Sequence, residues 1–231
     1  MSRRLALLSM VLWAAGCSGG LHSDGPPMQI YLLRAAPAPP LASEASGDAV
    51  VRPLDRSTAN APAAGVPSAP TLQVARPSAD PGLSTELITL VRSDHRLDYY
   101  SGSRWAAELP DVVSTLALDT LRASGDWGAV HDSPGTFSSD YILQITIRRF
   151  EADYTDGKPA PKVHVMLDCT LARRVGRELV TSFSVQSVAD AGENRLGTVV
   201  AAFEKAANTA LGEMAARSAT AVRNAPVTAA Q

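Results

Sequence analysis

Strict alternation of apolar and polar residues predicts two long strands in the second half of the chain. Across residues 141–147 every second residue is apolar, and after residue 149 the apolar positions move to the other parity. A period of two is typical of a half-buried strand. The change of parity predicts a β-bulge near Arg148 and Arg149. A turn signal at residues 156–157 then favours a hairpin. The return strand has one apolar face, made of Val163, Val165, Leu167, Cys169 and Leu171.

Shorter segments of the same kind predict further strands. Residues 29–34 and 72–76 are short strand candidates, and residues 87–91 and 96–100 form a hairpin pattern around Ser93-Asp94-His95. A turn at residues 173–177 leads to another strand, whose apolar face consists of Leu179, Phe183 and Val185.

Two segments instead repeat their apolar residues at helical spacing. The first begins near Asp111 and ends at Gly125, and the second begins near Arg195 and continues to Met214. Together the elements predict an α+β fold, an antiparallel sheet with two amphipathic helices packed on one face. The other face of such a sheet is free to meet solvent or a partner.

The N-terminus has the order of a secretory signal. Two arginines precede a short apolar run, and small residues lead into Ala14-Ala15-Gly16-Cys17. That run is too short to span a bilayer. The four residues resemble a bacterial lipobox, with Ala14 in place of the usual leucine. We therefore expect cleavage before Cys17 and attachment of lipid to its thiol, which would hold the protein on a membrane.

The composition divides the rest of the chain. Residues 1–16 are the expected signal peptide and residues 17–28 a lipidated tether. Residues 29–70 combine the short strand with a flexible stretch that is half Ala and Pro from residue 35 onward. The short strand either docks on the domain or belongs to the tether. One α+β domain is expected over residues 71–216, followed by a flexible tail at 217–231.

Charge and motifs exclude several classes of function. Without Arg3 and Arg4 the mature chain has 19 basic and 23 acidic residues, a formal charge of −4, and no basic stripe that suits nucleic acid. If Cys17 carries lipid, Cys169 has no disulfide partner, and its place on an apolar face predicts a buried thiol. No phosphate loop, dinucleotide motif or metal-ligand spacing occurs. We therefore expect no catalytic residue, cofactor or metal.

A weaker hypothesis is a periplasmic hydrolase. A G-x-S-x-G match at residues 16–20 lies at the signal cleavage site, not between a strand and a helix, so it is not a nucleophile elbow. His131 stands beside Asp132 in a polar segment, whereas His22 and His95 fall in solvated segments and His164 on the polar face of its strand. Sequence alone cannot show the geometry of a triad.

One segment has the residue types of a binding surface. Tyr99, Tyr100, Arg104 and Trp105 cluster around Ser101-Gly102-Ser103, which we expect to form a flexible turn. Tyr, Trp and Arg are enriched at the energetic centres of protein interfaces. These four residues are therefore candidates for binding a partner. The alternative is that Tyr99 and Trp105 fill the core where the strand meets the helix.

The same region resembles the ABC-type transport auxiliary lipoprotein family. The resemblance covers residues 29–34 and 71–214 and rests on the order of short motifs behind a lipobox: Pro81-Gly82-Leu83, the strand at 87–91, Tyr99-Tyr100, Arg104-Trp105 before a helix, the strand at 141–150 and the helix start at 199–203. The Ala/Pro-rich stretch at 35–70 is longer than the family pattern.

The resemblance implies a periplasmic accessory subunit that accompanies an ABC ATPase, a permease and an MCE-type substrate-binding protein. Such systems move phospholipids or other hydrophobic molecules between two membranes. By the sorting rules of bacterial lipoproteins, Asp directly after the lipidated cysteine favours retention in the inner membrane. Because Ser18 stands there instead, we expect the protein at the outer membrane, facing the periplasm. The expected partners are the MCE-type protein, the membrane through Cys17 and possible further copies of the chain. The alternative is a general outer-membrane structural or assembly lipoprotein with a different partner.

Overall fold

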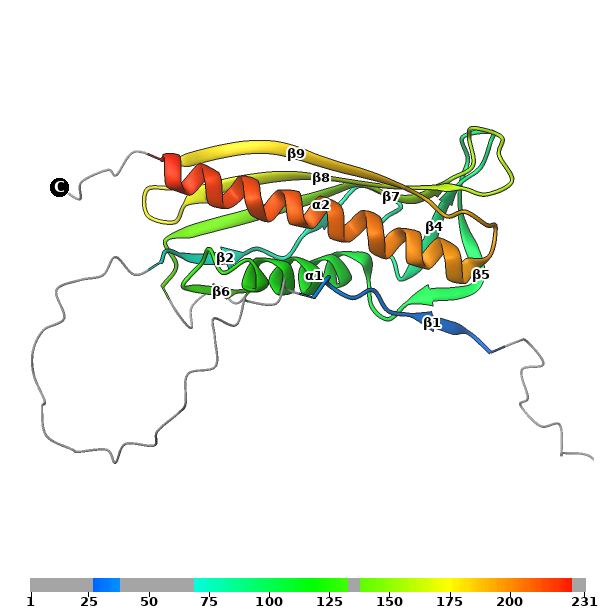
Figure 1. Ribbon diagram of the computed structural model, residues 1–231, viewed down its shortest axis with the longest axis horizontal. Coiled ribbons are helices and arrows are strands. Elements are labelled where there is room, and N and C mark those ends of the chain that lie inside the picture. Colours follow the sequence, from blue (N-terminus) through cyan, green and yellow to red (C-terminus); the bar gives the residue numbers. More distant parts are fainter. Residues whose placement is uncertain (1–26, 38–68, 133–137, 226–231) are drawn as a thin grey trace, which may run out of the picture.

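The computed structural model describes residues 27–37, 69–132 and 138–225. Two helices cover one face of a mixed sheet that does not close into a barrel (Figure 1). The long strands are β7 (Tyr141–Asp153), β8 (Lys162–Arg173) and β9 (Leu179–Asp190). The expected signal peptide, Cys17 and most of the Ala/Pro-rich stretch lie outside the described residues.

The prediction of an antiparallel sheet is only partly confirmed. The pairs β7–β8, β8–β9 and β4–β5 are antiparallel, but β7 accepts β2, β3 and β4 in succession along its other edge, all parallel to it. The pairs β1–β5 and β2–β6 are parallel as well. These short strands are β1 (Gln29–Tyr31), β2 (Thr71–Val74), β3 (Ser78–Ala79), β4 (Leu87–Val91), β5 (Leu97–Trp105) and β6 (Ala129–His131).

The predicted β-bulge in β7 is confirmed. Ile147 pairs with Leu167 and Arg149 with Met166, so Arg148 is the additional residue. Arg148 projects from the face opposite the helices and forms ion pairs with Asp80 and Asp168 at 2.8 and 2.7 Å. The bulge thereby keeps the apolar residues on both sides of it directed to one core.

A second irregularity, between β8 and β9, corrects the predicted face of β9. Leu171 pairs with Thr181 but Ala172 pairs with Leu179, so Val180 is the extra residue. Phe183 and Val185 are buried as expected. Leu179 leaves that face and is 60% exposed, because the bulge reverses the alternation before residue 181.

Helix α1 (Leu109–Ala123) has Pro110 in its first turn, where the missing N–H costs no hydrogen bond. Helix α2 (Leu196–Asn224) extends past Ala216, the expected end of the domain. Ser218 and Ala219 are buried, and Arg223 forms an ion pair with Asp126 at 3.1 Å. The assignment of residues 217–224 to a flexible tail is therefore wrong, because small Ala and Ser side chains continue the buried stripe.

The open question about the first strand is resolved, since β1 docks. Gln29–Tyr31 pairs with residues 103–105 of β5. The chain then runs along α2, where the backbone N–H of Arg34 donates to Glu204 at 3.0 Å. The Asn208 side chain accepts from the N–H of Ala36 and donates to the carbonyl of Arg34, both at 2.9 Å. These contacts hold a segment that lies far from α2 in the sequence.

Candidate partner-binding surfaces

Trp105 belongs to the core and not to a binding surface. Its side chain is 1% exposed and meets Phe150 and Phe203 edge to face, with ring centroids 6.1 and 5.2 Å away. Phe150 and Phe203 stack on each other at 5.2 Å. The three rings join β5, β7 and α2, so the candidate role of Trp105 in partner binding is replaced by a structural one.

The remaining predicted binding residues have partners within the chain. The Tyr100 and Tyr154 hydroxyls are 2.8 Å apart, and burial together with this hydrogen bond raises the pKa of Tyr100. Arg104 forms an ion pair with Glu86 at 2.5 Å, and the Tyr99 hydroxyl donates to the Gly82 carbonyl at 3.3 Å. That Tyr99, Tyr100 and Arg104 also contact a partner stays a prediction.

The expected flexible turn at Ser101-Gly102-Ser103 is instead an irregular part of β5. Leu87 pairs with Arg104, but Thr89, two residues on, pairs with Tyr99, so β5 carries three extra residues in between. Gly102 has φ +66°, a left-handed conformation that suits glycine. The interruption bends β5 and lets its second half pair with β1.

Sequence reasoning did not identify a groove on the face of the sheet opposite the helices. The cavity, of about 670 Å³, lies where β7, β8 and β9 meet the β8–β9 turn. We call it the arginine groove. It is lined by Ile142, Gln144, Thr170, Ala172, Arg173, Arg174, Arg177 and Leu179. No acidic residue is among those that line it, so Arg174 and Arg177 give the groove a positive charge, whereas the charge of Arg173 is balanced by Glu178.

The groove joins that charge to exposed apolar side chains. Arg174 donates to the buried Gln73 side chain, and Arg173 lies 3.5 Å from Glu178 and over the Tyr141 ring. Val175, at the tip of the turn, is 86% exposed, and Leu179 is 60% exposed. A signal was present in the sequence, since Arg173-Arg174-Val175-Gly176-Arg177 is strongly basic, but the contribution of β7 was not visible there.

Comparison with known proteins shows which family the chain belongs to. Residues 53–215 match the family model of the ABC-type transport auxiliary lipoprotein component. The chain belongs to this family. No curated protein sequence matches the chain. Membership of this lipoprotein family supports a membrane-anchored, periplasmic protein and agrees with the resemblance seen in the sequence.

Solved structures agree with this auxiliary lipoprotein fold. The crystal structure of protein XCC0632 from Xanthomonas campestris has a TM-score of 0.66 and 24% identity, covering 84% of this chain and 97% of that chain. An uncharacterized protein of known crystal structure has a TM-score of 0.57 and 14% identity, with 85% and 99% covered. At these identities the likeness shows the fold alone.

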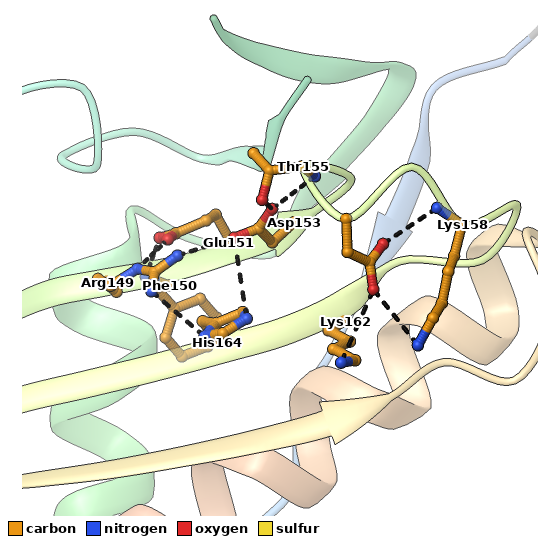
Figure 2. Close-up of polar contacts among 9 residues, drawn as sticks. Arg149, Phe150, Glu151, Asp153, Thr155, Lys158, Lys162 and His164 are labelled. Carbon is orange, nitrogen blue, oxygen red and sulfur yellow. Dashed lines mark hydrogen bonds and ion pairs between the residues drawn. The ribbon is translucent and has the colours of Figure 1, made fainter. Parts of the chain in front are cut away.

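The auxiliary lipoprotein domain also contains a polar cluster around Arg149 (Figure 2). Its guanidinium donates to the buried Glu151 and to Asp153, at 2.5 and 3.0 Å, and lies 3.3 Å from Nδ1 of His164. The N–H and hydroxyl of Thr155 donate to Asp153 as well. Because each carboxylate is paired or hydrogen-bonded, the cluster ties β7 to β8 and to the turn between them.

Electrostatics give this cluster a preferred protonation state. Burial and then the Arg149 charge lower the pKa of His164, which favours the neutral imidazole, the form that can accept a hydrogen bond from Arg149. Burial would raise the pKa of Asp153, but the hydrogen bonds from Thr155, together with His164 and Arg149, outweigh it and the net shift is downward. His164 thus lies on the polar face, as predicted, with neighbours that the sequence did not reveal.

Other candidate residues of the auxiliary lipoprotein fall in structural positions. Cys169 is fully buried, and burial raises the pKa of its thiol to about 12, which confirms the expected small hydrophobe. His95 lies in the β4–β5 turn with φ +62°, and His131 ends β6. In the described ranges no group of three or more His, Cys, Asp or Glu can hold a metal ion. Neither described helix is long and apolar enough to cross a membrane.

Proposed function

We propose that the protein is the lipid-anchored accessory subunit of an ABC transport system whose substrate-binding protein is of the MCE type. The lipid on Cys17 holds the domain at the outer membrane, and the domain docks the MCE-type protein. The system moves phospholipids or other hydrophobic molecules across the envelope. The observation that carries the proposal is the family match over residues 53–215, behind the lipobox at residues 14–17.

Membrane attachment and partner docking would take place towards opposite ends of the long axis of the domain. The described chain begins before β1, towards one end, whereas the β8–β9 turn lies at the other end (Figure 1). Arg173, Arg174 and Arg177, at that turn, line the arginine groove. Helix α2 spans much of that length, and 29 residues at ~1.5 Å each give about 44 Å. A partner that approaches the end remote from the anchor therefore meets the arginine groove first.

The chemistry of the arginine groove suits a protein partner that presents acidic and apolar side chains. Guanidinium groups bind carboxylates in a bidentate geometry, and Arg is frequent among the residues that dominate binding energy. Val175 and Leu179 supply apolar contact beside that charge. Tyr100, whose hydroxyl is bonded to that of Tyr154, and Arg104, which is paired with Glu86, are separate candidate contacts on β5.

The docking step is tested with variants of the groove. Arg177→Asn removes a positive charge and introduces a residue that tolerates the left-handed φ of +52° at this position. Val175→Ser removes the exposed apolar side chain. Each should weaken binding of the cognate MCE-type protein about thirtyfold, or ~2 kcal/mol. The control is Arg195→Asn, which is 75% exposed at the start of α2. Equal affinity of all variants and the parent would reject the groove as the docking site.

The membrane anchor and the partner's identity are tested in cells. Cys17→Ala should abolish incorporation of radioactive fatty acid and leave precursor or soluble protein, and unchanged labelling would end the lipoprotein proposal. Mass spectrometry of proteins crosslinked to the parent in intact envelopes should recover the MCE-type protein. Recovery of another envelope protein in its place would favour the general structural or assembly lipoprotein.

A further inference from the structure

An apolar stripe is exposed on the segment that enters the domain. Met28, Ile30 and Leu32 are 54, 57 and 64% exposed. The alternate residues Tyr31 and Leu33 turn inward and pack against the core. The segment therefore has two apolar faces, one buried and one bare, although a surface strand normally alternates apolar with polar residues.

The stripe is held in position and cannot fold inward. Strand β1 is the last strand on its side of the sheet, paired only with β5 among the described strands. Hydrogen bonds from the backbone N–H groups of Arg34 and Ala36 to Glu204 and Asn208 fix the chain directly after it. Because the inward positions are filled, the three outward side chains stay on the surface as one row, and the exposed Arg34 continues the same alternation.

The length of chain before the stripe limits what can cover it. Ten residues lie between Cys17 and Met28, and the eleven steps from one residue to the next reach at most about 40 Å when fully extended. If Cys17 carries lipid, the bilayer surface is always within that distance of the stripe, at a high effective concentration. An apolar row followed by an arginine also fits the lipid interface, where apolar groups enter and guanidinium groups remain at the headgroups.

We propose that the face formed by Met28, Ile30 and Leu32 rests on the lipid bilayer, as a second contact beside the acyl chains. The inference relies on the lipidation of Cys17 put forward above. The contact fixes how the domain stands on the membrane, because β1 is hydrogen-bonded to β5 and its following segment to α2. A single flexible tether would not restrict the orientation of the domain.

Fluorescence of the lipidated protein in vesicles tests this contact. Ile30→Cys is labelled with an environment-sensitive thiol probe, since the sulfur of a lipidated Cys17 is blocked and Cys169 is fully buried. The control is Val188→Cys on β9, whose native side chain is 53% exposed, close to the 57% of Ile30. Met28→Cys and Leu32→Cys give two further reporters on the same face. The vesicles contain phosphatidylethanolamine and phosphatidylglycerol.

The expected result is a blue-shifted emission and quenching by spin-labelled lipid at positions 28, 30 and 32, and neither at 188. Water-like emission at all four positions, with the protein still floating with the vesicles, would overturn the bilayer contact and leave the lipoprotein proposal intact. Probe burial that appears only at high protein density would assign the stripe to a second copy of the chain. Protein that lacks acyl chains by mass and does not float would overturn both proposals.

Discussion

The hydroxyl of Tyr100 on β5 lies 2.8 Å from the hydroxyl of Tyr154, which follows β7, and Tyr154 in turn donates to Asn194 before α2 at 2.7 Å. This chain of hydrogen bonds links three elements that are distant in the sequence. Tyr100 is therefore a structural residue whether or not it also contacts a partner.

Tyr100→Phe should lower the free energy of unfolding by about 1 kcal/mol, the usual net value of one hydrogen bond, while the ring stays in place. Urea unfolding measures the change. The matched control is Tyr99→Phe, which removes only the longer bond to the Gly82 carbonyl and should cost less. A larger loss in the Tyr99 variant would contradict the structural assignment of Tyr100.

Arg104→Ala and Trp105→Ala separate binding from folding. Arg104 and Glu86 are each about 40% exposed, so their ion pair contributes at most ~1 kcal/mol and melting should change little. Trp105→Ala should cost about 3–5 kcal/mol, because it empties the contact with Phe150 and Phe203. Affinity for the MCE-type protein is measured in parallel. A loss of binding in Arg104→Ala at unchanged melting temperature would confirm its predicted role in docking.

Acidification should destabilise the domain through His164. Its pKa is lowered in the folded state, so below the ordinary value of 6.5 the unfolded chain binds the proton first. The contribution of His164 to stability is therefore complete above that pH, and it is lost as the pH drops from 6.5 towards the lower, folded-state pKa. In melting temperatures measured over a series of pH values, His164→Gln should remove this pH dependence, and His95→Gln, at an exposed turn, should retain it. A pH dependence unchanged by His164→Gln would contradict the prediction.

The stability of the domain should depend on α2 as far as its last residue, Asn224. Removing residues 217–231 deletes the buried Ser218 and Ala219, the partly buried Val222 and the ion pair of Arg223 with Asp126. We expect a loss of about 2 kcal/mol or more, since burial of one valine-sized side chain contributes ~1.5–3 kcal/mol. Removing only residues 226–231 is the control and should leave the melting temperature nearly unchanged. Equal stability of the two truncations would mean that residues 217–224 do not pack.

The amino-acid sequence determined those features that depend on neighbours along the chain. The period of two in β7 and β8 gave their buried faces, and its break at Arg148 located the bulge. The helical stripe of α2 was visible from Val199 to Met214, but the next turns use Ser218 and Ala219, which carry little hydropathy. The antiparallel hairpins were also predictable, because a short turn leaves adjacent strands few other ways to pair.

Only the tertiary structure decided the contacts between distant segments. Nothing in β2, β3 or β4 marks β7 as their parallel neighbour, since any exposed strand edge offers the same backbone groups. The burial of Trp105 required Phe203, 98 positions later, and the arginine groove required Ile142 and Gln144 beside the β8–β9 turn. Backbone hydrogen bonds do not distinguish one strand from another, so the pairing was selected by how all apolar faces fit into one core.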